Sequence, residues 1–171
     1  MSIVDQAKHI LEQFPIYKEL PASLSGKHHF GETHKTHIEL TVIVMEHLCD
    51  EFNIKGEDRD LLIAAAYLHD IGLYKITQKG KVDLPGWKYF EQSGYSRNEN
   101  LMYKHGTVGA QVLDDFEIDR KEELKRLISV HMSHWYKDEP QPNTLYEYLI
   151  CIADYIASKG ENIFRYEKTH K

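Results

Sequence analysis

Two adjacent residues, His69 and Asp70, have side chains that could bind a metal ion. They follow residues 61–68, a strongly apolar segment with helical spacing. Burying an ionised carboxylate without a partner is costly, so an aspartate in this position is expected to be paired, hydrogen-bonded or bound to a cation. The neighbouring imidazole can ligate the same cation. Gly72 is expected to let the chain turn sharply beside the pair. Taken alone, the pair indicates either a metal site or an exposed helix end.

Other residues with the same chemistry lie elsewhere along the chain. The sequence has 11 histidines, whereas average composition would give about four. His37 falls within a predicted helix, His105 begins another, and His131 shares a face with apolar residues. Asp154 is a carboxylate within the apolar run 152–156. Core packing alone does not explain such residues on several helices, so they predict a metal centre.

Two further histidines lie one helical turn from these candidates. His34 precedes His37, so one of the two is expected to ligate while the other supports it or faces solvent. His134 follows His131 and is a further candidate ligand or substrate contact. The remaining histidines are expected on the surface or in loops, at His9, His28, His29, His47 and His170.

Helices are the expected elements that position these residues. Hydrophobic periodicity predicts six helices, at residues 3–14, 33–52, 57–73, 105–116, 120–131 and 145–160. Ser2, Asp119 and Thr144 are expected to cap three of them. No segment shows sustained period-two alternation. Residues 74–101 lack periodicity and are expected to form a long connecting loop of the kind that serves as a lid or a binding loop. The fold class predicted is all-α, with residues 1–171 forming one domain.

Composition excludes several classes of protein. The net charge is -6 and the pI is near 6.0, so no basic field favours nucleic acid. No apolar run reaches the roughly 20 residues that span a bilayer, and residues 1–6 lack the features of a signal peptide. Cys49 and Cys151 are expected to be small core residues in a reducing compartment. These features predict a cytoplasmic protein whose small anionic ligand is held by local cations or metal.

The order of these residues resembles the HD superfamily of metal-dependent phosphohydrolases. Three segments carry the likeness, at residues 66–72 (AYLHDIG), 105–110 (HGTVGA) and 153–158 (ADYIAS). The resemblance implies an HD-type helical bundle with two metal sites. It assigns the first metal to His37, His69, Asp70 and Asp154, and the second to Asp70, His105 and His131, with Asp70 as a bridge.

The sequence departs from the family pattern at two positions. Some relatives have two adjacent histidines at the position of His131, but here Met132 follows it. His134 is therefore a candidate to complete the metal ligands at this position or to contact substrate. Leu73 stands where the family signature often has a lysine, and Lys75 lies two residues further on.

The resemblance implies hydrolysis of a phosphate ester of a nucleotide or a similar small phosphorylated molecule by metal-activated water. Asp70 and His69 would be the central catalytic residues. Ligation rich in nitrogen favours Mn, Fe, Co, Ni or Zn over Mg. Three cations in or next to the long loop are candidates to bind phosphate, although they could equally be solvated: Lys75, Arg97 and Lys104. Four loop aromatics could stack a base or simply pack the loop: Trp87, Tyr89, Phe90 and Tyr95.

Two other functions remain open at this point. Some HD-type proteins hold a di-iron pair that activates O₂, and the same ligand pattern would serve an oxygenase. A non-catalytic nucleotide-binding module is the other alternative, although such a module would have little need of a bridging aspartate.

Overall fold

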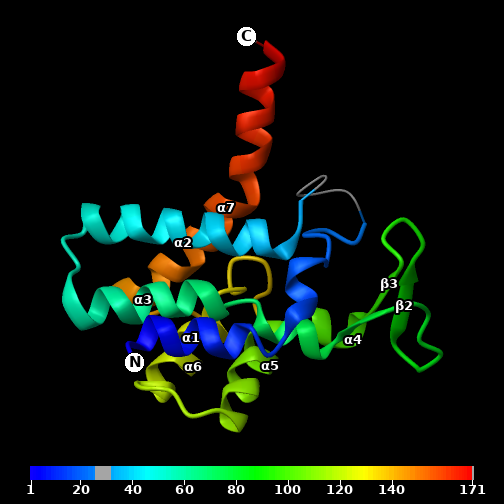
Figure 1. Cartoon of the computed structure of the whole chain (residues 1–171), viewed down its shortest axis with the longest axis horizontal. Helices are drawn as coiled ribbons and strands as arrows, with labels where there is room; N and C mark the ends of the chain where they lie inside the picture. The colour runs from blue at the N-terminus through cyan, green and yellow to red at the C-terminus, as the bar shows by residue number, and fades with distance from the viewer. Residues whose placement is uncertain (26–31, 171) are drawn as a thin grey trace.

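The computed structural model describes residues 1–25 and 32–170, with side chains as far as residue 159. This part of the chain is mostly helical, with one small sheet, as Figure 1 shows. The α-helices are α1 (Ile3–Leu11), α2 (His34–Glu51), α3 (Gly56–Leu68), α4 (Glu99–Met102), α5 (His105–Val112), α6 (Lys121–Val130) and α7 (Leu145–His170). The predicted all-α class is thus confirmed, and none of the described helices is both long and apolar enough to cross a membrane.

Helix α3 is the centre of the bundle. It packs against α1, α2, α6 and α7, and Leu61, Leu62 and Leu68 are each no more than 1% exposed. A helix that is apolar on nearly all sides is expected to be buried in this way. The two cysteines, which are free, also lie in the interior as predicted. The core therefore holds the end of α3, where His69 and Asp70 follow, in a fixed position.

Side-chain caps begin several helices, and those at Ser2 and Thr144 are the ones that the sequence predicts. The hydroxyl oxygen of Ser2 accepts a hydrogen bond from the amide of Asp5 at the start of α1. Thr33 caps α2 in the same way, and Thr144 accepts from the amide of Glu147 at the start of α7. These bonds satisfy amides that have no partner within the helix.

The predicted cap at Asp119 is wrong. Arg120 is the residue that precedes α6, with a left-handed φ of 53° and no side-chain cap. The amide of Asp119 donates to the side-chain oxygen of Gln6, and its carboxylate accepts from the amide nitrogen of the same side chain, both at 2.9 Å. Asp119 therefore joins the start of α6 to α1 and does not cap the helix.

Several helix ends differ from the predictions. Helix α3 stops at Leu68 rather than near residue 73, and a short 3₁₀ helix, η2 (Ile71–Lys75), follows. The ring of His69 bonds to the Ala66 carbonyl, which the amide of Asp70 would bond in a continuing α-helix. Helix α5 ends at Val112 and passes into the 3₁₀ helix η3 (Leu113–Asp115). Helix α7 continues past Gly160 to His170, because one glycine costs a helix only about 1 kcal/mol.

The predicted loop at residues 74–101 contains regular structure. Strands β1 (Thr77–Lys79), β2 (Trp87–Phe90) and β3 (Tyr95–Asn98) form an antiparallel sheet in the order β1-β3-β2. Figure 1 shows β2 and β3 extending away from the helical body. The strands have three or four residues each, too few for alternation to be visible in the sequence. This sheet carries Arg97 on its central strand, opposite Thr77.

Candidate metal centre

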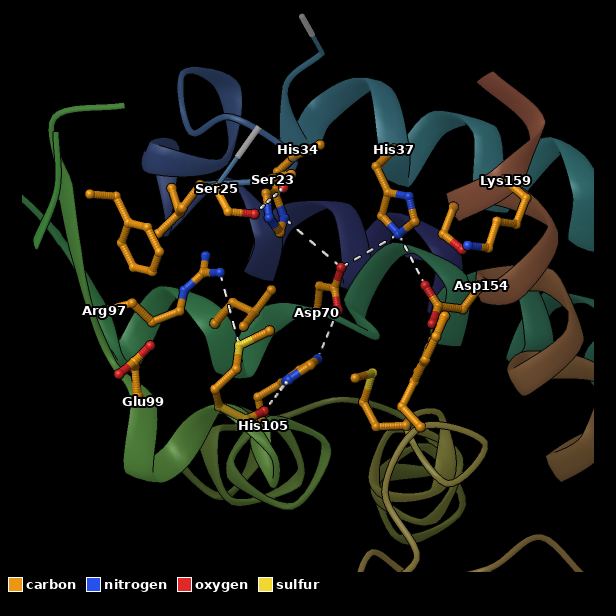
Figure 2. A pocket seen from close by; sticks show the side chains of 18 residues that line it. Ser23, Ser25, His34, His37, Asp70, Arg97, Glu99, His105, Asp154 and Lys159 are labelled. Atoms are coloured by element: carbon orange, nitrogen blue, oxygen red, sulfur yellow. Dashed lines mark hydrogen bonds and ion pairs between the residues drawn. The ribbon is translucent and has the colours of Figure 1, made fainter. Parts of the chain in front are cut away.

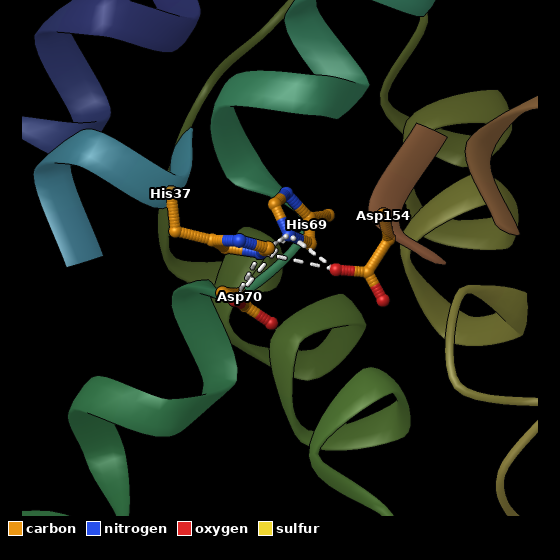
Figure 3. A group of neighbouring side chains, drawn as sticks. All are labelled: His37, His69, Asp70 and Asp154. Carbon is orange, nitrogen blue, oxygen red and sulfur yellow. Dashed lines mark hydrogen bonds and ion pairs between the residues drawn. The ribbon is translucent and has the colours of Figure 1, made fainter. Parts of the chain in front are cut away.

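Four of the predicted ligands meet where α2, α3 and α7 come together, as Figure 3 shows. One donor atom from each of His37, His69, Asp70 and Asp154 lies within 4.8 Å of the others, and all four residues are buried. Nε2 of His37 is 3.2 Å from Nε2 of His69 and 3.1 Å from Oδ1 of Asp154. These residues come from distant parts of the sequence and converge as a possible set of metal donors.

A second group of donors lies on the other side of Asp70. Oδ1 of Asp70 is 3.2 Å from Nε2 of His105 and 3.2 Å from Nε2 of His131. Oδ2 of the same carboxylate faces the first group, at 3.3 Å from Nε2 of His69 and 3.5 Å from Nε2 of His37. Asp70 is therefore the one residue that the two groups share, with one oxygen for each.

The hydrogen bonds of three histidines prepare their rings to bind metal. The Nδ1 atoms of His69, His105 and His131 each lie 2.7–2.8 Å from the carbonyl oxygen of the residue three positions earlier. An Nδ1–H that donates to a carbonyl leaves the lone pair of a neutral ring on Nε2. All three Nε2 atoms point into the donor groups, so a cation between them fits this arrangement.

The ends of helices supply those carbonyl oxygens. His69 and His131 directly follow the last residues of α3 and α6. His105 begins α5, and its carbonyl partner Met102 is the last residue of α4. The last carbonyls of a helix lack an amide partner within it. The ends of α3, α4 and α6 beside the site thus supply carbonyl oxygens that orient the three imidazoles.

Close packing of glycines brings η2 against α5. A Cβ atom on Gly72 would clash with the carbonyl oxygen of His105 and would lie 2.6 Å from the amide nitrogen of Gly109. The sequence predicted a sharp turn at Gly72, but its φ is outside the left-handed region, and the need for glycine is the close approach of two backbones. This approach places Asp70 within reach of His105.

Electrostatics keep both carboxylates ionised. Burial alone would raise the pKa of Asp70, but His69 and the neighbouring imidazoles hold it well below its usual value. Burial likewise lowers the pKa of His69, yet the negative charges of Asp70 and Asp154 outweigh it and raise that pKa well above 6.5. The two carboxylates therefore favour a positive charge beside them.

His34 lies beside the two donor groups and is a member of neither. Its Nδ1 atom is 3.9 Å from Oδ2 of Asp70 and 3.4 Å from the hydroxyl of Tyr74. Its side chain is buried, and burial lowers its pKa to about 3, so the ring is neutral. Of the two histidines at the start of α2, His37 is the one that the structure places as a possible ligand.

The structure does not bring His134 into either donor group. Its ring is exposed on one side and packs against Trp135 and Tyr155. His9 and His47 are exposed as expected, whereas His28 and His29 and the side chain of His170 lie outside the described residues.

A pocket of about 310 Å³ opens onto the donor groups, as Figure 2 shows. Of the three predicted phosphate contacts, Arg97 lines it. Lys75 is exposed, with Nζ 6.0 Å from the centre of the Phe14 ring, and Lys104 extends over Tyr103; neither reaches the pocket. Of the four loop aromatics, the pocket wall includes Phe90.

Several residues of the pocket were missed by the sequence analysis. Their side chains are those of Ser23, Ser25, Glu99, Trp135 and Lys159, with Met102 and Met132 as apolar walls. Lys159 lies on α7 shortly after Asp154, and this nearness was the available signal. No signal marked Ser23 and Ser25, because the segment before α2 has no periodic pattern.

The comparisons with known proteins assign the chain to a family. Residues 35–159 match the HD domain, a span that includes all six residues of the two donor groups. Comparison with curated proteins and with solved structures gave no match. The match covers well over half of the chain and agrees with the order of the histidines and aspartates, so the protein belongs to the HD-domain family.

Proposed function

We propose that the protein is a metal-dependent phosphohydrolase that cleaves a phosphate ester of a nucleotide or of a similar small phosphorylated molecule. The observation that carries the proposal is the position of Asp70, whose two oxygens face two nitrogen-rich donor groups beneath one pocket. Membership of the HD-domain family supports it.

Each donor group offers a suitable set of ligands for a divalent ion. His37, His69, Asp70 and Asp154 would hold one ion, and Asp70, His105 and His131 a second. Neutral imidazoles and carboxylates favour Mn, Fe, Co, Ni or Zn over Mg, which prefers oxygen ligands. Bound ions of this kind lower the pKa of water and neutralise charge on a phosphoryl group.

The protein's own residues would orient the substrate and limit access of water. Leu73, Met102 and Met132 form apolar parts of the pocket wall, which strengthens electrostatic interactions within it. The guanidinium of Arg97 and the ammonium of Lys159 also line the pocket and would offset the charge of a phosphorylated ligand.

The size of the pocket supports a small substrate. Its volume of about 310 Å³ lies at the lower end of the range of roughly 300–1,000 Å³ for small-molecule sites. A net charge of -6 also does not favour binding of a long nucleic acid. A nucleotide or a smaller phosphate ester is therefore the class to test.

The proposal is tested by turnover. The purified protein is loaded with Mn²⁺, or with Fe²⁺ under anaerobic conditions, and given nucleoside mono-, di- and triphosphates and cyclic or bridged phosphodiesters. We expect at least one panel member to be hydrolysed by the wild type and not by Asp70→Ala, and the preferred member would define the substrate class.

Absence of turnover on the whole panel, in protein with tightly bound metal, would contradict the proposal. In that case, O₂ consumption by the iron-loaded protein would support the di-iron oxygenase alternative. Binding of a nucleotide that is never turned over and that survives in Asp70→Ala would support a non-catalytic binding module.

A further inference from the structure

Arg97 is a buried cation that forms no ion pair with a carboxylate of the described residues. Its side chain is on the central strand β3 and is only 7% exposed. Nε donates to the hydroxyl oxygen of Thr77 at 2.9 Å, and Nη1 lies 3.9 Å from the thioether sulfur of Met102. Within the described part of the chain, Nη2 has no hydrogen-bond partner and no carboxylate forms an ion pair with Arg97.

The other arginines with described side chains behave differently. Arg59 donates to Asp50, Arg120 to Asp58 and Glu123, and Arg126 to Glu147. Each of these guanidinium groups is therefore matched by a carboxylate. A purely structural role for Arg97 accounts for its bond to Thr77, but not for a buried Nη2 atom that has no hydrogen-bond partner among the described residues.

Burial of such a group carries a cost. A guanidinium that is removed from water without an ion-pair partner is unfavourable. Burial lowers the pKa of Arg97 to about 10, although the negative charge of Asp70 acts in the opposite direction. The group nevertheless remains protonated at neutral pH. An anion that enters the pocket would pair with this charge and would satisfy the Nη atoms.

Arg97 lies at one end of the pocket, away from part of the metal-donor set. Figure 2 shows Arg97 and Glu99 on one side, Asp154 and Lys159 on the other, and Asp70 and His105 between them. Bound ions would hold the scissile phosphoryl group near Asp70. Arg97 is then free to contact another part of the same ligand.

His34 supplies a second unpartnered atom in the same pocket. Its side chain is 2% exposed and lines the wall, and among the described residues no group forms a hydrogen bond with its Nε2 atom. In Figure 2, His34 lies between Arg97 and His37. Two buried polar groups in one wall, each with a free nitrogen, indicate a place where a ligand makes hydrogen bonds.

We propose that Arg97 and His34 form a second anion-binding subsite, so that the substrate carries another oxyanion group, a phosphate or a carboxylate, besides its scissile phosphate. Because Nε of Arg97 is held by Thr77, the edge formed by Nη1 and Nη2 is the one that faces the ligand, and this edge matches the two oxygens of such a group. The proposal deepens the proposed function and rests on it for the position of the scissile phosphate.

Binding of phosphonates tests the subsite without turnover, because a phosphohydrolase does not cleave their C–P bond. The probes are ethylphosphonate, with one oxyanion group, 3-phosphonopropionate, which adds a carboxylate, and ethylene-1,2-bisphosphonate, which adds a second phosphonate. Their dissociation constants are measured calorimetrically on the Mn²⁺-loaded wild type, Arg97→Gln and Arg97→Lys. Arg59→Gln, in which a surface guanidinium is removed, is the matched control.

We expect the wild type to bind at least one doubly anionic probe about tenfold or more tightly than ethylphosphonate, as a charge-assisted hydrogen bond provides. The doubly anionic probe with the larger gain in affinity over ethylphosphonate shows whether the second group is a carboxylate or a phosphate. Arg97→Gln should abolish the preference and lower the affinity for ethylphosphonate far less than the affinity for the doubly anionic probe. Arg97→Lys should retain part of the preference, and Arg59→Gln should match the wild type.

Three results would overturn the subsite. The first is equal binding of all probes by the wild type, which does not depend on any variant folding. The second is a preference that persists in Arg97→Gln, since this would arise from chelation by the metal alone. The third is an equal loss of affinity for all probes in Arg97→Gln, which would place Arg97 on the metal-bound group. If the preference holds but no phosphate ester is hydrolysed, the proposed function fails and the subsite stands.

Discussion

The Nε2 atoms of His105 and His131 lie 3.2 Å apart, and each lies 3.2 Å from the same oxygen of Asp70. Both rings direct Nδ1 at backbone carbonyl oxygens, so neutral imidazoles would place two lone pairs face to face. Such contacts are unfavourable unless a cation or a proton lies between them. This relationship leads us to expect a second metal ion.

Removal of the shared carboxylate should affect both metals. We expect Asp70→Asn, which keeps the shape of the side chain, to lose most of both ions because one oxygen is directed at each group. Asp154→Asn should lose only the ion of the first group. Metal content is measured by plasma mass spectrometry after gel filtration. It should fall from about two ions per chain to nearly none in Asp70→Asn and to about one in Asp154→Asn. Equal metal content in the two variants would contradict the bridging role.

Loss of one imidazole should be selective for its own group. We expect His105→Gln to retain the ion held by His37, His69 and Asp154, because His105 contacts Asp70 and His131 and none of those three. Replacement with glutamine lowers the affinity of the second group by at least about tenfold, the lower limit seen even for outer-shell partners. Titration of the metal-free variant with Mn²⁺, followed by electron paramagnetic resonance, should reveal one tight site. Two unchanged sites would show that His105 is not a ligand.

Metal binding should release protons. In the metal-free protein the pKa of His69 is raised by Asp70 and Asp154 despite burial, so the ring is protonated at pH 7 and must lose its proton to ligate. Affinity for Zn²⁺ should therefore increase as the pH rises from about 6 to about 8. Calorimetry in buffers with different ionisation enthalpies measures the protons released. A pH-independent affinity with no proton release would contradict this account.

The close packing at Gly72 should be required for the metal centre. A methyl group there meets backbone atoms of His105 and Gly109 that have no side-chain freedom to move aside. We expect Gly72→Ala to lower the free energy of unfolding by about 1–3 kcal/mol or more and to reduce metal content. Gly80→Ala is the control, because Gly80 has a φ of 85° with open space around it. It should lose stability through backbone strain and keep its metal.

Much of the site could be predicted from the sequence because its polar, ionisable residues stand within apolar segments. Charged or polar side chains such as Asp70 and Asp154 stand among apolar neighbours, and such positions are rarely tolerated without a function. The starts of α1, α2 and α7 also agree with the prediction to within one residue. At each of them a hydroxyl side chain caps the helix just before its apolar periodic pattern begins. The structure brings the six candidates together, while their role as ligands remains a prediction.

What the sequence did not predict depends on contacts between distant segments. The strands of the sheet are too short to show a pattern, so the burial of Arg97 was not foreseen. Asp119 has a good residue type for a cap, but its carboxylate accepts a tertiary hydrogen bond from the side chain of Gln6 instead. Lys159 was missed despite its nearness to Asp154, because a lysine in a helix is usually solvated.

The most direct test of the central claim is phosphate release by the chelator-stripped protein as Mn²⁺ is added back, with the best substrate of the panel. We predict no release without metal, a rise that saturates at about two ions per chain, and no release by Asp70→Asn at any metal concentration. Full activity in the stripped protein, or equal activity in Asp70→Asn, would contradict a phosphohydrolase centred on Asp70.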